Sequence, residues 1–288
     1  MPLNYIHWNP DPEIVNIFGV SLRYYGLLFV SGLLLSIYVL GRIFRKESIP
    51  QENLEKLSIY AMVGILAGGR LGHCLFYEPA YYLSHPLEMI LPVTFVQGGG
   101  VKFIGYQGLA SHGGALGLFI ALVFYSRKTK HNLIDTIDLI AIVAPIGSAF
   151  IRLANLMNSE IIGTPTTKPW GFVFERVDNV PRHPAQLFEA LIYFVIFWIM
   201  LSLYQRKRVK LKNGFFFGLV LVLIFTARFF IEFIKEDQVG FEAGMALNMG
   251  QLLSLPYIIV GIGFIIYGIK KTRRPADSLP QAFGSTIN

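Results

Sequence analysis

The stretch LIYFVIFWIMLSL, from Leu191 to Leu203, decides the fold class of this chain, because no charged residue interrupts it. Comparable apolar stretches run from Leu27 to Leu40 and from Phe215 to Phe225. The hydrocarbon core of a bilayer requires about 20 predominantly apolar residues in each helix that crosses it. Each stretch meets this requirement together with its flanks, so the sequence predicts membrane-spanning helices.

The composition of the whole chain supports the same class. Hydrophobic residues make up 53% of the 288 residues, charged residues make up 15%, and the mean hydropathy is +0.52. This is too little charge to cover the surface of a water-soluble protein of this length. The composition therefore excludes an ordinary soluble enzyme.

Runs of suitable length for a membrane span occur seven times along the chain. They lie at about 20–41, 58–77, 109–126, 135–157, 187–204, 214–234 and 250–269. We therefore predict an all-α, polytopic membrane protein with about seven transmembrane helices. Residues 1–270 are expected to form a single integral membrane domain, and residues 271–288 a disordered cytoplasmic tail.

The basic residues of the loops predict the orientation. Alternate loops carry 16 Lys and Arg residues on one side of the predicted membrane and 5 on the other. Cytoplasmic loops are enriched in Lys and Arg, so the N-terminus is expected outside and the C-terminus in the cytoplasm. The net charge of +7 is distributed among short loops rather than gathered on one face. This distribution argues against nucleic acid as a partner.

Two long segments, 78–108 and 159–186, are then external and are expected to hold loops and short helices. The first contains Tyr81 and Tyr82, and the second contains Trp170. Aromatic residues gather where a membrane meets water. These segments are interpreted either as an amphipathic, lipid-facing cap or as ordinary interfacial loops.

Polar residues inside the predicted spans gather in one layer. A charge at membrane depth costs about 2.5–3.5 kcal/mol on insertion scales, so it normally faces a partner or a ligand. With the predicted orientation, five helices place such residues near the outer face of the membrane: Tyr25, Arg70, His112, Arg152 with Asn155 and Asn158, and Arg228 with Glu232. This layer is where we expect the chemistry of the protein.

Arg152, Asn155 and Asn158 follow one another at intervals of three residues and share one helix face. Arginine supplies several fixed N–H donors and no acceptor, which suits a phosphate group. Arg70, Arg152 and Arg228 are therefore candidate phosphate ligands, with Glu160 and Glu232 as the obvious counter-charges. The alternative for Arg228 and Glu232, at i and i+4, is that they neutralise each other.

His112 precedes Gly113 and Gly114, which permit close backbone approach or a helix start with free N–H groups. His112 is a candidate general base, and the alternative is a hydrogen-bonded packing residue. The single cysteine, Cys74, is interpreted as a small hydrophobic residue. Metalloprotease, esterase and phosphate-loop motifs do not occur, so we expect neither a metal nor an organic cofactor.

Three further polar residues receive minor roles at this stage. His183 is interpreted as a helix-entry element and Asp138 as a structural residue. Glu189, one turn into the span at 187–204, is a possible cavity group.

The pattern Arg152-x-x-Asn155-x-x-Asn158-x-Glu160-x-x-Gly163 resembles the signature of bacterial prolipoprotein diacylglyceryl transferases. Further blocks occur in the family's order, and together they cover nearly the whole chain: Tyr25-Gly26, Gly69-Arg70, Ser111-His112-Gly113-Gly114, Arg182-His183-Pro184 with Gln186, Arg228 with Glu232, and Met249-Gly250-Gln251 with Ser254 and Pro256. Ile151 and Ala154 stand where the family usually has glycine, and Ile224 stands where it often has tyrosine.

The resemblance implies a multi-pass enzyme of the bacterial inner membrane. It would transfer the diacylglyceryl group of phosphatidylglycerol to the lipobox cysteine of a prolipoprotein, which forms a thioether and releases glycerol phosphate. This is the first step of bacterial lipoprotein maturation. The active site is expected toward the periplasmic, outer leaflet, and the oligomeric state is left open.

The resemblance also implies roles for individual residues. Arg152 and Arg228, with Asn155, would stabilise charge on the phosphate oxygens. His112 would take the proton of the thiol, and Tyr25 would position or polarise the reacting groups, as would Glu232. An arginine-assisted deprotonation is compatible with the same set. The remaining matched positions are assigned to substrate binding: Asn158, Glu160, Gly163, Arg70, Gly113 and Gly114.

A transporter or a lipid-binding protein for an anionic substrate is the alternative function. Glycine-rich helices with arginines at membrane depth fit a transporter. However, the sequence shows no internal repeat, and the polar residues cluster toward one face, with Asp138 nearly alone at the other.

Overall fold

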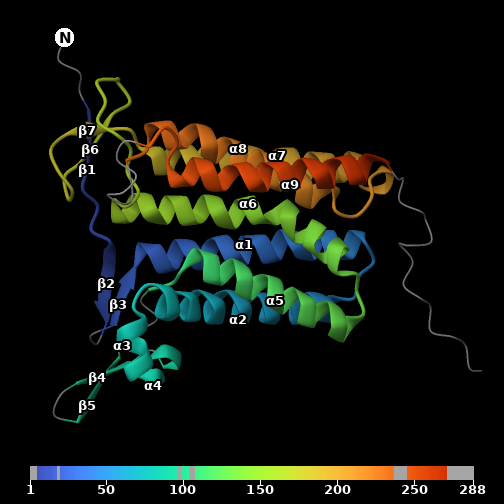
Figure 1. Cartoon of the computed structure of the whole chain (residues 1–288), viewed down its shortest axis with the longest axis horizontal. Coiled ribbons are helices and arrows are strands. Elements are labelled where there is room, and N and C mark those ends of the chain that lie inside the picture. The colour runs from blue at the N-terminus through green and yellow to red at the C-terminus, as the bar shows by residue number, and fades with distance from the viewer. Residues whose placement is uncertain are drawn as a thin grey trace, which may run out of the picture. The chain divides into compact units, whose positions relative to one another are not determined.

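A computed structural model describes residues 5–17, 20–91, 93–96, 99–103, 108–236 and 245–270 (Figure 1). Within these residues the chain divides into two compact units. The first unit comprises residues 1–43 and 137–288, and the second comprises residues 44–136. The predicted disordered tail, 271–288, lies outside the described residues, and the single domain predicted for residues 1–270 stays a prediction.

Each of the seven predicted spans is occupied by a long helix in the described part of the chain. These helices are α1 (Tyr24–Lys46), α2 (Gln51–Phe76), α5 (Ser111–Thr129), α6 (Leu133–Asn158), α7 (Ala185–Lys207), α8 (Phe215–Ile231) and α9 (Met249–Lys270). Six of them are long and apolar enough to cross a membrane, and α5 is the exception. The chain is therefore a mostly helical protein with six candidate membrane-spanning helices.

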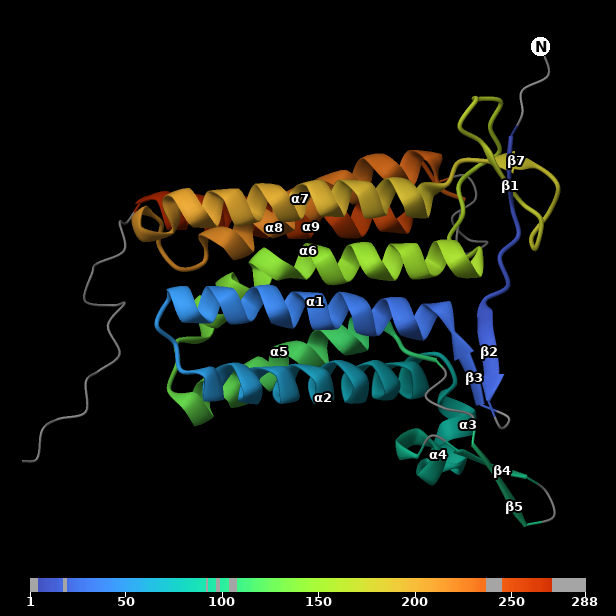
Figure 2. The same ribbon diagram turned by 180° about the vertical axis from the view of Figure 1, so that it is seen from behind.

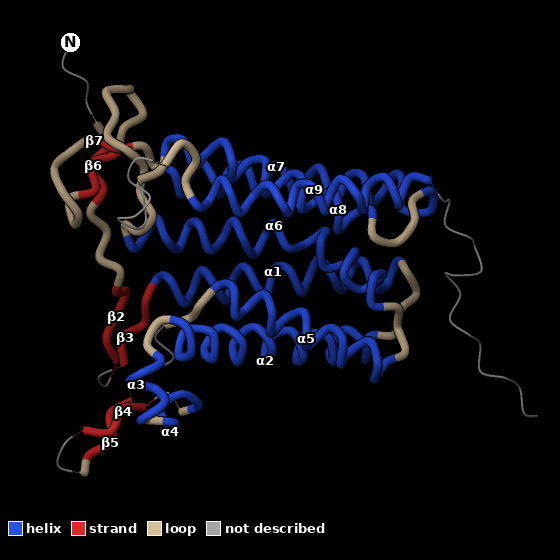
Figure 3. The backbone as a smooth tube through the Cα atoms, viewed as in Figure 1, coloured by secondary structure: helices blue, strands red, loops and turns tan. Residues whose placement is uncertain are grey.

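The segments before and between the long helices contain more regular structure than predicted. Figure 3 shows short strands there, in red. The elements are α3 (Pro79–Ser84), α4 (Pro86–Ile90), η1 (Arg208–Lys210), η2 (Glu232–Ile234), β1 (Ile6–Trp8), β2 (Glu13–Ile17), β3 (Val20–Arg23), β4 (Val93–Val96), β5 (Gly100–Phe103), β6 (Phe172–Phe174) and β7 (Pro181–Arg182). The all-α prediction holds for the main body and misses three small sheets.

In the first unit, glycines allow the helices to pack closely. α8 and α9 approach at Gly218 and Gly261, where a Cβ atom on either residue would come within 2.7 Å of the other's carbonyl oxygen. A Cβ on Gly32 of α1 would likewise overlap Phe150 of α6. Small residues at such crossings are the usual basis of helix association in membranes, because they let backbones approach. Helices α6 to α9 run side by side in both views (Figures 1 and 2).

Asp138 of α6 joins three segments of the first unit. Its fully buried carboxylate accepts hydrogen bonds from the backbone N–H groups of Gly214 and Phe217, both at 2.8 Å, at the start of α8. It also pairs with Arg208 Nη1 at 3.3 Å. The first N–H groups of a helix have no partner within the helix, so an acidic side chain there caps it. Asp138 therefore has a structural role.

Replacing Asp138 with alanine is expected to destabilise the protein by about 3–5 kcal/mol, since it removes the carboxylate that pairs with the buried Arg208 guanidinium and caps α8. Thermal unfolding of the purified protein in detergent measures this change. Glu52→Gln is the control, because Glu52 forms an exposed i, i+4 pair with Lys56 that contributes little to stability. Equal unfolding temperatures for the two variants would contradict the capping role.

In the second unit, α2 and α5 pack along a row of small residues. Gly64, Gly68 and Gly72 of α2 face Gly113 and Gly117 of α5, and a Cβ atom on any of the five would come within 3.0 Å of a backbone atom of the facing helix. This spacing of four residues is the small-residue pattern of close helix pairs in membranes. The row fixes the position of the first turn of α5, which carries His112.

In the second unit, α3, α4 and the β4–β5 hairpin are organised around Glu88 of α4. Its buried carboxylate accepts hydrogen bonds from Tyr81 Oη at 2.8 Å, Thr94 Oγ1 at 3.1 Å and the backbone N–H of Phe95 at 2.9 Å. The bond from the Phe95 N–H, followed by those from the two hydroxyls, lowers the pKa of Glu88 below its usual value. Glu88 thus stays ionised and holds the β4–β5 hairpin against α3 and α4.

The three-stranded sheet of the first unit has the order β1-β6-β7, with β1 parallel to β6. Trp8 of β1 packs with Leu156, Ile162, Phe172 and Phe174 in a small hydrophobic core. The Trp8 indole N–H also donates to the carbonyl oxygen of Leu156 at 2.9 Å, which satisfies one of the last carbonyls of α6. The N-terminal strand therefore supports the end of α6, where the predicted signature residues lie.

Candidate active site

The signature residues of α6 converge around one carboxylate. Asn155 Nδ2 donates to Glu160 Oε2 at 3.1 Å, and Asn158 Nδ2 donates to Glu160 Oε1 at 3.0 Å. The chain turns back after α6 because Ser159 and Ile161 adopt positive φ angles of 56° and 58°. A left-handed conformation is strained for a β-branched residue such as Ile161, and such strain is concentrated at functional sites. Asn155 and Asn158 thus lie on one helix face, as their spacing of three residues predicts.

Arg152 lies beside this turn and is held by three neighbours. Its Nε atom lies 2.8 Å from Glu189 Oε2, and its Nη1 donates to Asn155 Oδ1 at 3.3 Å. The Tyr193 hydroxyl is a further hydrogen-bond partner. Glu189, on α7, is fully buried. The ionic partner of Arg152 is therefore Glu189, whereas the sequence suggested Glu160 or Glu232 as counter-charges.

Glu189 connects Arg152 to a second group of charges at the end of α8. Lys235, which follows η2, places Nζ 3.4 Å from Glu189 Oε1 and 3.3 Å from Glu232 Oε2. Arg228 Nε lies 4.0 Å from the same Oε2 atom of Glu232. The charges alternate in sign from Arg152 to Arg228, and α6, α7 and α8 with η2 contribute to the row. We call these five residues the charge row.

Arg228 is the cation of the charge row with the longest ion-pair distance. Its separation from Glu232 is longer than the 2.7–2.9 Å of a charge-assisted hydrogen bond. Among the residues that the structure describes, its Nε atom has no hydrogen-bond partner, and its side chain is 35% exposed. The alternative that Arg228 and Glu232 simply neutralise each other is therefore weakly supported. A guanidinium group in this state can bind an anion.

Tyr25, the second residue of α1, belongs to the same unit and is half-buried. It interacts electrostatically with Glu160 and with Arg152. The first unit therefore brings Tyr25 together with the signature residues of α6, as the sequence analysis expects.

Gly163 has a packing role in the structure. A Cβ atom at this position would lie 2.5 Å from the carbonyl oxygen of His183 and 2.6 Å from that of Ile234. Its own N–H donates to His183 O at 2.9 Å, and the next residue, Thr164, donates to Ile234 O at 2.9 Å. Only glycine fits between the two segments. Gly163 thereby links the turn after α6 to the segment that carries Lys235.

Arg182 strengthens this link. It binds Asp178 through Nε and Nη2, with a shortest distance of 2.6 Å, and it reaches Glu236 Oε1 at 3.1 Å. The hydrogen bonds from Arg182 lower the pKa of Asp178, so this contact contributes stability that is lost as the pH falls through the lowered pKa. His183 accepts a hydrogen bond from the Trp170 indole at 3.2 Å, and burial lowers its pKa. These contacts give Arg182 and His183 structural partners beside the site.

The other predicted site residues belong to the second unit. His112 is the second residue of α5, and its side chain is exposed. Gly113 packs against Gly68, whereas a Cβ on Gly114 would meet only Ile65, at 3.5 Å. Arg70 is buried and donates to the carbonyl oxygens of Glu88 at 2.6 Å and Met89 at 3.3 Å, with its guanidinium 4.8 Å from the centre of the Tyr82 ring. Arg70 thus makes structural contacts within its own unit.

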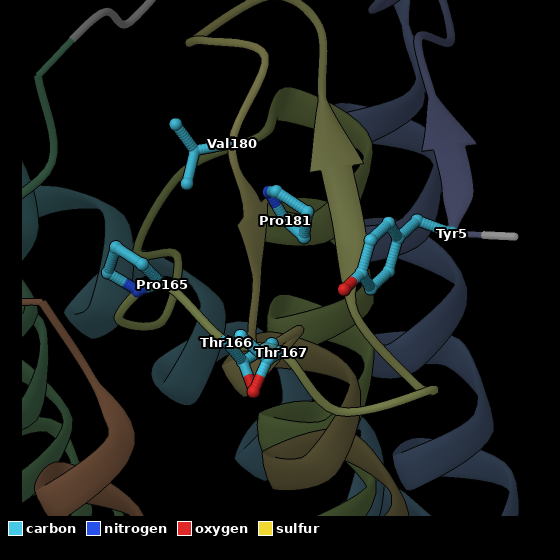
Figure 4. Close-up of a pocket in the computed structure, with 6 residues that line it drawn as sticks. All are labelled: Tyr5, Pro165, Thr166, Thr167, Val180 and Pro181. Carbon is cyan, nitrogen blue, oxygen red and sulfur yellow. The ribbon is translucent and has the colours of Figure 1, made fainter. Parts of the chain in front are cut away.

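A cavity of about 470 Å³ lies beside the three-stranded sheet of the first unit (Figure 4). Its lining comprises Tyr5, Pro165, Thr166, Thr167, Val180 and Pro181, with Tyr5 across from Pro181. None of these six residues carries a cation. The lining therefore lacks the groups that phosphate chemistry requires, and the charge row remains the candidate site.

Two members of the charge row, Glu189 and Lys235, are not among the catalytic or substrate-binding residues predicted from the sequence. Glu189 is considered there only as a possible cavity group, and Lys235 is counted as an external loop cation. A signal for Lys235 exists, because Arg228, Glu232 and Lys235 follow at i, i+4 and i+7, which places them on one helix face. Glu189 has no such local signal, since its partners come from other helices.

Comparison with known proteins shows the family of this chain. The family model described as prolipoprotein diacylglyceryl transferase matches residues 12–267. A phosphatidylglycerol–prolipoprotein diacylglyceryl transferase of Bacteroides fragilis is 59% identical over 93% of this chain and 97% of its own length. Proteins of the same name from Tolumonas auensis and Porphyromonas gingivalis are 42% and 40% identical, over 93% and 92% of this chain and 100% and 95% of their own lengths. These names do not favour a transporter. The chain belongs to the prolipoprotein diacylglyceryl transferase family.

Proposed function

We propose that this chain transfers the diacylglyceryl group of phosphatidylglycerol to the lipobox cysteine of a prolipoprotein. The cysteine sulfur forms a new C–S bond to the glyceryl carbon, the C–O bond to the phosphate breaks, and glycerol phosphate leaves. The proton of the thiol goes to a base. Membership of the family and the names of the relatives support the reaction.

The observation that carries the proposal is that Arg228 belongs to the same charge row as Arg152, and that its Nε atom has no hydrogen-bond partner among the described residues. The leaving group is a phosphate ester that gains negative charge as the C–O bond breaks. Preorganised N–H donors stabilise such charge. Arg152 is oriented by Glu189 and Asn155, and the Nε–H of Arg228 has no acceptor among the described residues. Asn155, Asn158 and Glu160 form the adjacent wall, with Tyr25 to position the reacting groups.

The setting of this site is also part of the proposal. The chain spans the inner membrane of a bacterium seven times, because α5 crosses the membrane in addition to the six candidate helices. The N-terminus is outside and the C-terminus is in the cytoplasm. The loop charges support this orientation, and polar residues at both ends of α5 account for its absence from the six helices that are long and apolar enough to cross a membrane. The site then faces the outer leaflet, where phosphatidylglycerol and exported prolipoproteins are both accessible. His112 is the proposed base.

The reaction is tested with the purified full-length protein in nanodiscs that contain phosphatidylglycerol labelled in its glycerol headgroup. A peptide with a lipobox cysteine is the acceptor. We expect one labelled glycerol phosphate to be released for each peptide that gains a diacylglyceryl mass. Nanodiscs with phosphatidylcholine as the only lipid are the control. Headgroup release without modified peptide would overturn the proposed transfer.

Arg228 gives a specific prediction in this assay. Arg228→Gln is expected to lower kcat/KM for phosphatidylglycerol by about 10²-fold, because it removes a charged donor from the phosphate. Arg228→Lys keeps the charge but loses the planar fork, and should recover part of the activity. Wild-type kcat/KM in Arg228→Gln would remove Arg228 from the site.

A further inference from the structure

Lys235 is buried although it follows the last turn of the α8–η2 segment, where a lysine could easily extend into water. It is 5% exposed, and its Nζ lies between Glu189 at 3.4 Å and Glu232 at 3.3 Å. Burying an ammonium group is costly unless it is paired. The two carboxylates come from α7 and η2, so the position of Lys235 is fixed from two sides. This arrangement restrains both carboxylates.

The restraint on Glu232 affects Arg228. Lys235 Nζ and Arg228 Nε approach the same oxygen, Oε2 of Glu232, at 3.3 Å and 4.0 Å. An arginine and a glutamate at i and i+4 are well placed to form a close pair on a helix. Here that pair stays open, and Lys235 holds the nearer position. Lys235 and Arg228 therefore compete for one carboxylate oxygen, and Lys235 has the advantage.

Helix α9 packs against the Glu232 carboxylate as well. A Cβ atom on Gly250 of α9 would lie 2.5 Å from the Glu232 carboxyl group, so α9 packs directly against it. The carboxylate is thus confined between the α9 backbone, Lys235 and Arg228. Without Lys235, the direction that remains favourable for it is toward the guanidinium of Arg228.

We propose that Lys235, anchored by Glu189, is a positioning residue that holds Glu232 away from Arg228 and so keeps the Arg228 guanidinium available to the phosphate of the lipid donor. This inference rests on the proposed function. Lys235 itself does not touch the substrate. It also balances charge, because the charge row together with Glu160 contains three cations and three carboxylates. Loss of Lys235 leaves one excess negative charge facing an anionic headgroup.

The expected effect is on binding more than on chemistry. Lys235→Met should raise KM for phosphatidylglycerol by about 10–30-fold, with a much smaller change in kcat, because it weakens binding of the headgroup. The dissociation constant for glycerol phosphate, measured by direct titration of the protein, should rise in parallel. Lys235→Arg keeps the cation and should stay near the wild type. Lys168→Met, which removes an exposed lysine from the external segment, is the control for net charge.

Two double variants of equal net charge separate positioning from mere folding. In Lys235→Met with Glu232→Gln, the competing carboxylate is gone, so KM should return to within about threefold of the wild type even if kcat falls. In Lys235→Met with Glu189→Gln, Glu232 stays charged and free to close on Arg228, so KM should stay high. Equal KM values for the two double variants would overturn the proposal. Because the glycerol phosphate titration needs no turnover, it tests Lys235 separately from the transfer reaction.

Discussion

Replacing Arg152 with alanine is expected to lower kcat/KM for diacylglyceryl transfer by about 10³-fold or more. Loss of one preorganised donor to a developing oxyanion costs about 10²–10³-fold, and Arg152 supplies several donors and a full charge. Its orientation is fixed by Glu189 at 2.8 Å and by Asn155 at 3.3 Å, so its donors need no reorganisation during the reaction.

The same substitution leaves the buried Glu189 with Lys235 as its cationic partner. Thermal unfolding in detergent therefore accompanies the assay, to separate loss of chemistry from loss of fold. Arg152→Lys preserves the charge beside Glu189 and is expected to fold normally, yet to lose about 10²-fold because a lysine lacks the planar fork. Unchanged turnover in a folded Arg152→Ala protein would show that the phosphate is not bound here.

His112→Asn is expected to lower kcat by about 10²–10⁴-fold, the range in which general base catalysis contributes. Asparagine keeps the polarity and approximate size of the side chain but cannot take a proton from the thiol. The acid limb of the kcat/KM profile, which reports protonation of the base in the free enzyme, should vanish in this variant. The assay is the same peptide transfer, run across a range of pH values.

His7→Asn is the matched control for His112, because His7 is also an external histidine and its side chain is 68% exposed. It should leave both the rate and the pH profile unchanged. If His112→Asn retained the acid limb, the proton would be taken by another group, and an arginine-assisted deprotonation would become the better hypothesis.

The positions of the long helices could be predicted from the sequence, because six of the seven span enough apolar residues to be identified alone and α5 contains a shorter apolar run. Arg152, Asn155 and Asn158 could also be placed on one face, since their spacing lies within a single helix. The strands β1 and β6 could not be predicted, because each has three residues and they pair across more than 160 positions of sequence. Short apolar strands carry no periodic signal of their own.

The partners within the site were harder to predict than its members. Glu189 and Arg152 stand on different helices, and no spacing rule pairs them. Lys235 looked like an ordinary external cation, although its spacing from Glu232 and Arg228 gave a local signal. The sequence predicts the same membrane depth for Arg70 as for Arg152 and Arg228, yet Arg70 donates to the backbone carbonyl oxygens of Glu88 and Met89. Depth alone therefore does not distinguish a ligand-binding arginine from a structural one.

The parallel pairing of β1 with β6 sets an order of assembly. Ile6 has its strand partner at Phe172, and Trp8 donates to the carbonyl of Leu156. At a synthesis rate of about 5–20 residues per second, the first strand waits roughly 10–30 s for its partner to be made. Until then the outer end of α6 lacks the support of Trp8. The reacting groups therefore come into register late, so a chain still being made by the ribosome does not yet hold a finished catalyst.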